Sequence, residues 1–212
     1  MSAIYHILIH FFIGYIMAFI GLMSPGLLTM TTLNTAIDKG RKQAVKFVTG
    51  AVIPIILQAH IALFGSEYLR THPEVIKRFS KIAIFVFLIL SVYFFHQYKN
   101  RKQVVKSVRF SIDNSFFNGL MVSLINPLAI PFYFTYTVLL EMKGVLEFKQ
   151  PFISIFVAGA VFGAFSILRI YANNARPLLS RLQFVARHFK LILAIVMFIL
   201  SIAAFINAYK IS

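Results

Sequence analysis

Two prolines that interrupt long apolar runs are the residues of most chemical interest: Pro25, in Ser24-Pro25-Gly26, and Pro127, in Asn126-Pro127. Proline inside a helix removes a backbone hydrogen bond and clashes with the preceding turn. In an apolar environment the freed carbonyls must be satisfied by other parts of the protein or by water in a cavity. One such interruption is most simply a packing kink. Two at matching places predict a binding site for a polar solute.

Hydroxyl and amide side chains surround both interruptions. Such groups can hold the carboxylate and ammonium groups of a zwitterionic solute, and exposed helix ends add their dipoles. For any one of these residues, a hydrogen bond between helices is the simpler interpretation, and it contributes only about 0.6 kcal/mol on average. The set predicted to bind solute is Ser24, Pro25, Gly26, Thr29, Asn118, Ser123, Asn126 and Pro127.

The titratable residues offer few sites for a buried charge, because all six acidic residues fall at the ends of apolar runs or between them. Asp38, Asp113 and His60 are the candidates for carrying a proton, although a neutral histidine bonded between helices explains His60 equally well. His6 and His10 share a helical face without a third ligand, which favours anchoring at an interface and predicts no metal site. The chain has no cysteine, hence no disulfide or thiol nucleophile.

Composition indicates which elements position these residues. Of 212 residues, 59% are hydrophobic and 13% are charged, whereas soluble domains carry about 25% charged residues. A bilayer core needs about 20 apolar residues of helix, so the runs predict an all-α integral membrane protein with about six transmembrane helices. Five spans remain an alternative, because the third and fifth runs are short. The predicted spans are Ile4–Met23, Ala44–Phe64, Ile82–Tyr98, Phe116–Leu140, Phe152–Leu168 and Leu191–Tyr209.

The net charge of +15 would suggest a nucleic-acid partner in a soluble protein, but here the basic residues lie between apolar runs. Most of the 21 basic residues follow the first, third and fifth runs. The positive-inside rule places those segments in the cytoplasm and both termini outside, in an inner (plasma) membrane, although Arg70–Lys81 on the other side is also basic. The cytoplasmic set is Lys39, Arg41, Lys42 and Lys46; Lys99, Arg101, Lys102, Lys106 and Arg109; and Arg169, Arg176, Arg181, Arg187 and Lys190.

The two halves of the sequence share an order of motifs. Each half has Gly-Leu-Met, then a proline, then Gly-Ala-Val in the next run, and three spans per half would give the halves opposite orientations. We therefore expect a single membrane domain, 1–212, with an inverted repeat: one three-helix repeat at 1–98, a basic cytoplasmic linker at 99–113 and a second repeat at 114–212. Gly159 and Gly163 form a Gly-x-x-x-Gly pair, which is typical of close helix packing and is compatible with a homodimer. The matched motifs are Gly21-Leu22-Met23 with Gly119-Leu120-Met121, and Gly50-Ala51-Val52 with Gly159-Ala160-Val161.

These motifs resemble those of the LysE/RhtB amino-acid exporter family over nearly the whole chain. The resemblance implies a six-helix, inverted-repeat secondary transporter that exports amino acids or related small metabolites, with the proton as coupling ion. Leu27 and Leu128 stand where the family has proline and lysine, which indicates a divergent branch. The motifs that carry the resemblance are Pro25-Gly26, Gly40-Arg41-Lys42 with Gly50, Phe117-Asn118-Gly119-Leu120, and Asn126-Pro127-Leu128-Ala129-Ile130 with Phe132.

Other functions fit the sequence less well. Neutral amino acids suit the hydroxyl and amide lining better than lysine or arginine, because no acidic residue lies inside a predicted span. An intramembrane enzyme needs a nucleophile–base pair, paired carboxylates or metal ligands, and the sequence shows no such motif, nor one for a nucleotide or another cofactor. A scaffold that contacts anionic lipids would explain the basic segments but not the matched prolines. A small-solute channel remains an alternative.

Overall fold

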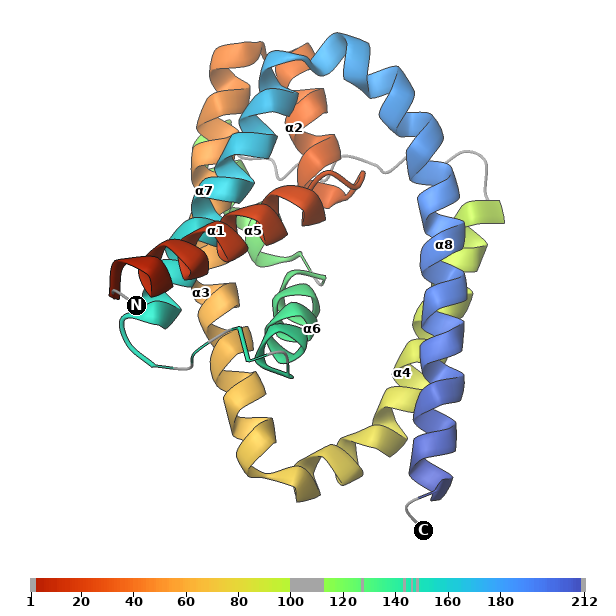
Figure 1. The fold of residues 1–212 in the computed structure, drawn as a ribbon. Coiled ribbons are helices and arrows are strands. Elements are labelled where there is room, and N and C mark those ends of the chain that lie inside the picture. The colour runs from red at the N-terminus through yellow and green to blue at the C-terminus, as the bar shows by residue number, and fades with distance from the viewer. Residues whose placement is uncertain are drawn as a thin grey trace. The chain divides into compact units, whose positions relative to one another are not determined.

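The computed structural model describes residues 3–99, 113–126, 128–142, 144–145, 147 and 149–210. Every regular element in these residues is an α-helix, which confirms the predicted all-α class (Figure 1). The helices are α1 (Ala3–Gly21), α2 (Leu27–Asp38), α3 (Arg41–Thr71), α4 (Pro73–Lys99), α5 (Ser115–Leu124), α6 (Ala129–Met142), α7 (Phe152–Asn173) and α8 (Ala175–Lys210).

The apolar helices identify a multi-pass membrane protein. Ile4–Gly21 of α1, Arg41–Tyr68 of α3 and Phe152–Asn173 of α7 are each long and apolar enough to cross a bilayer, and α5 with α6 passes the same test as a pair bent by 58°. The fifth predicted span looked short in the sequence, but α7 continues to Asn173. The third and sixth spans remain predictions, since the apolar parts of α4 and α8 are shorter: Ile84–His96 and Leu191–Ile202.

The chain forms two compact units. Unit 1 comprises Met1–Glu67 and Lys106–Arg181, and unit 2 comprises Tyr68–Val105 and Leu182–Ser212. Each unit takes helices from both halves of the chain. The repeat boundaries at 1–98 and 114–212 stay a prediction, and most of the linker at 99–113 lies outside the described residues.

Close crossings of helices at glycine organise unit 1. A Cβ on Gly14 of α1 would collide with the Phe156 carbonyl of α7, and one on Gly159 of α7 would collide with the Phe11 carbonyl of α1. The next glycine of α7, Gly163, lies against the Tyr15 carbonyl. Residue numbers rise together along the two helices, so α1 and α7 run in the same direction.

A second crossing joins α3 and α5 in the same manner. Gly50 of α3 lies against the Phe116 carbonyl, and Gly119 of α5 lies against the Phe47 carbonyl. In the pairs Gly14–Gly159 and Gly50–Gly119, each glycine faces the carbonyl three residues before the partner glycine. The register of the α1–α7 crossing is therefore repeated at α3–α5.

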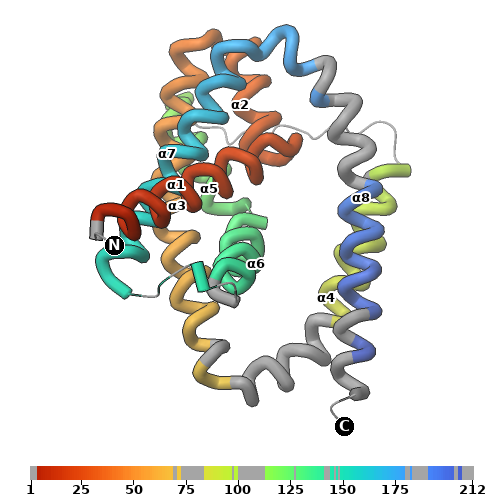
Figure 2. Tube along the Cα trace, viewed as in Figure 1, coloured from red at the N-terminus to blue at the C-terminus, as the bar shows by residue number. Residues whose placement is uncertain are grey.

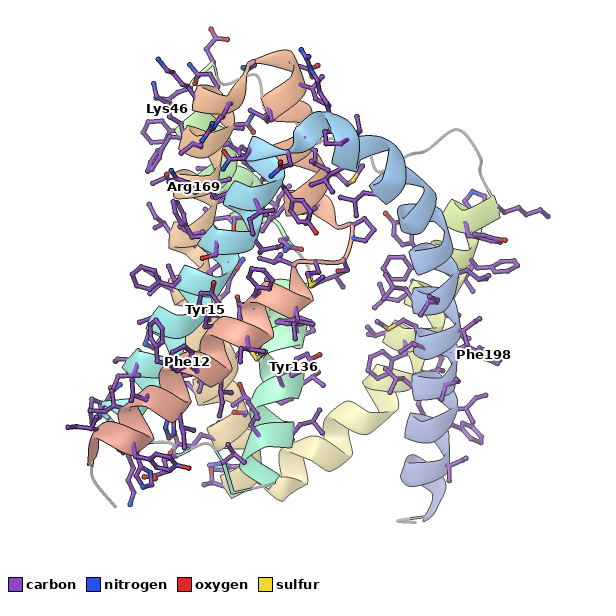
Figure 3. All side chains as sticks on the ribbon, turned by 45° about the horizontal axis from the view of Figure 1, so that its top comes forward. Phe12, Tyr15, Lys46, Tyr136, Arg169 and Phe198 are labelled. Atoms are coloured by element: carbon purple, nitrogen blue, oxygen red, sulfur yellow. The ribbon has the colours of Figure 1, made fainter. Side chains whose placement is uncertain are left out.

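The core of unit 1 fills the space beside these crossings with apolar side chains from α1, α3, α6 and α7. The fully buried Phe156 and Leu63 are among its largest members. The outward face of α1 is apolar as well, and Figure 3 shows Phe12 on it, about half exposed. An apolar outer surface over an apolar core is expected of a helix that faces lipid.

One end of unit 1 carries exposed basic residues. Lys39, Arg41 and Lys46 lie where α2 leads into α3, and Arg169 lies near the end of α7; all four are exposed. Figure 3 shows Lys46 and Arg169 toward the same end of the unit. The sorting of the basic residues to one side of the membrane stays a prediction.

Unit 2 packs α4 against the part of α8 from Leu182 onward. Ser91 Oγ donates to the Ala194 carbonyl at 2.9 Å, and Ser201 Oγ donates to the Ile84 carbonyl at 3.0 Å. Later residues of α4 thus pair with earlier residues of α8, so the two helices are antiparallel. Large apolar side chains on both helices are exposed, as at Phe198 (Figure 3).

The glycine crossings generate a stability prediction. Alanine normally stabilises a helix relative to glycine by up to about 1 kcal/mol. At Gly159 the added methyl group meets backbone atoms of α1, and overpacking of this kind costs about 1–3 kcal/mol. Gly159→Ala should therefore lower the melting temperature of the purified protein in detergent.

Gly65→Ala is the matched control, because a Cβ there would lie 3.9 Å from the Phe134 ring, an ordinary van der Waals distance. This variant should melt at or above the wild-type temperature. Equal melting temperatures for Gly159→Ala and Gly65→Ala would show that the crossing is not as close as described.

Candidate functional site

The first interruption lies between α1, which ends at Gly21, and α2, which begins at Leu27; Figure 2 shows the chain turning there. Ser24 Oγ donates to the Gly21 carbonyl at 2.9 Å. Thr29 Oγ1 lies 3.1 Å from the Leu22 carbonyl and 3.3 Å from that of Ser24. Local hydroxyl groups thus occupy carbonyls that a continuous helix would have paired with backbone N–H groups.

A side chain from another helix completes the first interruption. Tyr171 of α7 donates its hydroxyl to the Met23 carbonyl at 2.9 Å. The α1–α7 crossing brings Tyr171 within reach, although the two residues are 148 positions apart in sequence. With this bond, the carbonyls of residues 21–24 all have a hydroxyl partner.

The start of α2 also faces this interruption. Pro25 is buried, and Gly26 is the N-cap residue, with an extended backbone and no side chain to cap the first turn. The first amides of a helix have no partner inside the helix and carry partial positive charge. Pro25 and Gly26 therefore leave a polar helix end beside the interruption.

The second interruption lies between α5, which ends at Leu124, and α6, which begins at Ala129. Gln58 of α3, 4% exposed, donates Nε2 to the Ser123 carbonyl at 2.8 Å. The Asn126 backbone N–H donates to the same carbonyl at 3.1 Å, and Asn126 Oδ1 accepts from the Leu128 N–H at 3.3 Å. Pro127 itself lies outside the described residues.

Five buried side-chain atoms have no hydrogen-bond partner in the described part of the chain. They come from α2, α3 and α5, and α5 contacts both other helices. Leaving such an atom unpaired costs about 1–3 kcal/mol, so a group of them calls for an explanation. One explanation is a polar ligand that supplies the missing hydrogen bonds. The atoms are Thr31 Oγ1, Gln58 Oε1, Ser115 Oγ, Asn118 Oδ1 and Ser123 Oγ.

A contact between aromatic and glycine residues links the two interrupted helices. The ring of Phe132, in the first turn of α6, packs against Gly21 at the end of α1, where an added Cβ would collide with it. The end of α1 thus meets the start of α6.

The structure groups the predicted site residues at the two interruptions. At the first lie Ser24, Pro25, Gly26 and Thr29, and at the second lie Ser123 and Asn126, with Asn118 on the buried face of α5.

The candidates for proton coupling lie elsewhere in unit 1. Asp38, the last residue of α2, and Asp113, before α5, are exposed. His60 is partly exposed on α3, and its Nδ1 lies 2.8 Å from the Ile56 carbonyl of the same helix. A role for these three residues stays a prediction.

Sequence reasoning missed two residues of the site. Gln58 is an amide inside an apolar span, two positions before His60, and that isolation was a usable signal. Tyr171 gave no comparable signal, because tyrosine is common near the ends of membrane spans. Its role follows only from the crossing of α7 with α1.

Comparison with known proteins agrees with the predicted resemblance. The family model described as LysE type translocator matches residues 19–208, a region that includes both interruptions and all helices from α2 to α7. No curated protein and no solved structure matches the chain. Since the family model covers most of the sequence, the chain belongs to the LysE type translocator family.

Proposed function

We propose that this protein is a secondary transporter that exports amino acids or related small metabolites across the inner membrane, driven by the proton motive force. Membership of a translocator family and the apolar helices point to transport of small solutes by a multi-pass membrane protein. The observation that carries the finer proposal is the pair of interrupted helices with unpartnered polar atoms around α5. Interruptions at corresponding places in two halves are typical of transporter binding sites.

The contact registers support an inverted repeat. Exchanging α1 with α5 and α3 with α7 converts the Gly14–Gly159 contact into the Gly119–Gly50 contact. Gly-Ala-Val at 50 and at 159 thus occupies corresponding positions. The two Gly-Leu-Met motifs do not occupy corresponding positions, because Gly119 corresponds to Gly14 and not to Gly21.

The same exchange extends to unit 2. Exchanging α4 with α8 converts the bond from Ser91 to Ala194 into the bond from Ser201 to Ile84. In six alternating spans, the first and fifth run in the same direction and the third and sixth in opposite directions. The parallel pair α1–α7 and the antiparallel pair α4–α8 follow this pattern and favour six spans.

The two interruptions differ in how well their polar groups are satisfied. At the first, hydroxyl groups occupy the carbonyls of residues 21–24. At the second, Gln58 Oε1 and Ser123 Oγ are buried without partners. We therefore place a hydrogen-bonding group of the solute at the second interruption. Because amide and hydroxyl groups line it, a solute with a neutral side chain is favoured over a cationic one.

Efflux measurements test the function itself. Cells that express the chain should export a few labelled neutral amino acids, and an uncoupler should abolish that export because it removes the proton gradient. The panel should include lysine and arginine, which we expect to be retained. If no amino acid is exported while the protein is shown to be in the membrane, export of amino acids is wrong.

A single hydroxyl tests the site. Ser123→Ala removes an unpartnered buried oxygen, so it should leave the melting temperature unchanged or raise it. The same change should reduce the rate of export about tenfold, the effect of losing one hydrogen bond to the solute. Ser166→Ala is the matched control, since Ser166 donates its hydroxyl within α7, to the Phe162 carbonyl. Equal export by both variants would remove Ser123 from the site.

Cysteine labelling tests the orientation, because the natural sequence contains no cysteine. A membrane-impermeant maleimide should label Lys149→Cys in intact cells. It should label Lys46→Cys only after the cells are permeabilised. Both positions are exposed, so the opposite result would place the termini in the cytoplasm.

A further inference from the structure

The buried face of α5 is polar, although α5 belongs to a bent pair of helices that is apolar enough to cross a membrane. Its buried residues are spaced three and four apart, so they share one face. They are Ser115, Asn118, Gly119, Val122 and Ser123. Only Val122 among these carries an aliphatic side chain, whereas Phe117, on the other side of α5, is half exposed. A membrane helix with its polar residues turned inward is typical of one that lines a route for polar molecules.

Solute held at Gln58 and Ser123 leaves three buried oxygens unexplained. Thr31 Oγ1, Ser115 Oγ and Asn118 Oδ1 also lack a hydrogen-bond partner among the described residues. Ser115 lies eight residues before Ser123, which is roughly 12 Å along α5. The ammonium and carboxylate groups of an amino acid share one carbon atom, so the two groups of a solute held at Ser123 do not reach Ser115. A further ligand position is needed.

On α2, Thr31 differs from the threonines near it. The helix is enclosed in unit 1, since all residues from Leu28 to Leu33 are buried. Thr32 Oγ1 donates to the Leu28 carbonyl at 2.8 Å, and Thr35 Oγ1 donates to the Thr31 carbonyl at 2.8 Å. Such bonds to the preceding turn are the usual way in which a threonine in a helix is satisfied. The Thr31 hydroxyl makes no such bond.

The end of α2 and the start of α5 lie at the same end of unit 1. The next helix, α3, begins at Arg41, shortly after α2 ends at Asp38. Close to its start, α3 packs on the start of α5, where Gly50 meets the Phe116 carbonyl. Asp38 is exposed, so this end of unit 1 is open to solvent. The unpartnered oxygens of α5 thus extend from this end to the second interruption, along a helix that α2 contacts.

A glycine that does not pack on another helix flanks α2 at each end. A Cβ on Gly26, the N-cap residue, would meet only the Ser24 carbonyl, at 4.0 Å. Gly40, just after α2, has a positive φ of 85° and no atom within 4 Å of an added Cβ. Hinges are a few residues at the ends of elements that absorb changes in backbone angle. Rotation at these two glycines can move α2 relative to α5.

We propose that Thr31, Ser115 and Asn118 line a route for water and solute between α2 and α5 to the second interruption, and that the structure holds this route closed. In the closed form the three oxygens are buried without hydrogen bonds, which costs free energy. Movement of α2 at Gly26 and Gly40 admits water, which supplies those bonds. The ligand of the route is a small hydrogen-bonding molecule: water when no solute is present, and a neutral amino acid during export.

The passage of solute along this route rests on the proposed function. With the end that carries Asp38 in the cytoplasm, the route leads from the side on which export begins. Opening of the route to water does not depend on transport, because it follows from the unpartnered oxygens and the glycines that flank α2. It can therefore be measured on the purified protein.

Thiol labelling tests the opening, because the chain has no native cysteine. Thr31→Cys and Thr32→Cys are a matched pair, since both residues lie on α2 and are 0% exposed. Each full-length variant is placed in lipid nanodiscs and treated with 2-sulfonatoethyl methanethiosulfonate, a charged reagent about the size of an amino acid. Thr31→Cys should react at least about tenfold faster than Thr32→Cys, because the reactive thiolate forms where water reaches the sulfur.

A second comparison keeps the test valid if Thr31→Cys does not fold. Ser115→Cys replaces one oxygen by sulfur and should also react with the reagent. Thr31→Val removes the unpartnered hydroxyl and retains the shape of the side chain, so the closed form is favoured and labelling of Ser115→Cys should slow severalfold. Thr32→Val is the control and should leave that rate unchanged, because the Thr32 hydroxyl is bonded within α2.

Three outcomes would count against the route. Equal labelling of Thr31→Cys and Thr32→Cys, or a Ser115→Cys rate that Thr31→Val leaves unchanged, would overturn the proposal. An exported amino acid should slow the labelling of Ser115→Cys by occupying the route, and an unchanged rate would overturn the passage of solute. Because the first two comparisons need no transport, they refute the route alone, whereas a failed efflux assay refutes the proposed function.

Discussion

The hydrogen-bonding requirement of backbone carbonyls in an apolar medium is the constraint on which this structure depends. A continuous helix satisfies every carbonyl internally, but α1 and α5 do not continue into α2 and α6. The carbonyls released at each interruption need donors from side chains. Ser24, Thr29 and Tyr171 supply them at the first, and Gln58 supplies one at the second.

Those donors reach their carbonyls because helices cross closely at glycine. Without a Cβ at Gly159 or Gly50, the backbones of paired helices come into direct contact. Each crossing brings one donor helix beside one interrupted helix: α7 brings Tyr171 to the end of α1, and α3 brings Gln58 to the end of α5. Packing and polar chemistry are thus coupled, and a shift of one residue in either crossing would displace a donor from its carbonyl.

Local signals made much of the fold predictable from sequence. Uncharged runs located the helices of unit 1, and Pro25 and Asn126-Pro127 located the interruptions. Both signals are local, because a proline or a long apolar run determines the structure of the residues next to it in sequence. Contacts between distant positions were not predictable. Gln58 meets Ser123 across 65 positions and Tyr171 meets Met23 across 148, and only the register of the crossings brings them together.

The burial of His10 illustrates the same limit, because the sequence favoured anchoring at an interface but the side chain is 1% exposed. Its spacing from His6 correctly indicated a shared helical face, but the residues that cover it, Glu147 and Phe152, lie far along the chain. In the exchange proposed for the inverted repeat, Gly119 pairs with Gly14, so the Gly-Leu-Met match takes no part in it. Gly-Ala-Val at 50 and 159 was informative because each glycine has a structural task at a crossing.

The central claim is that the second interruption binds the solute through Gln58 and Ser123. Its most direct test is the shift in melting temperature of the purified protein when a neutral amino acid that it exports is added. Saturating ligand, at roughly 100 times the dissociation constant, should stabilise the wild-type protein by about 2.7 kcal/mol. The account predicts that Ser123→Ala melts at least as high as the wild type without ligand, yet shows a much smaller shift with it. An undiminished shift in Ser123→Ala would contradict the account, because the solute would then bind elsewhere.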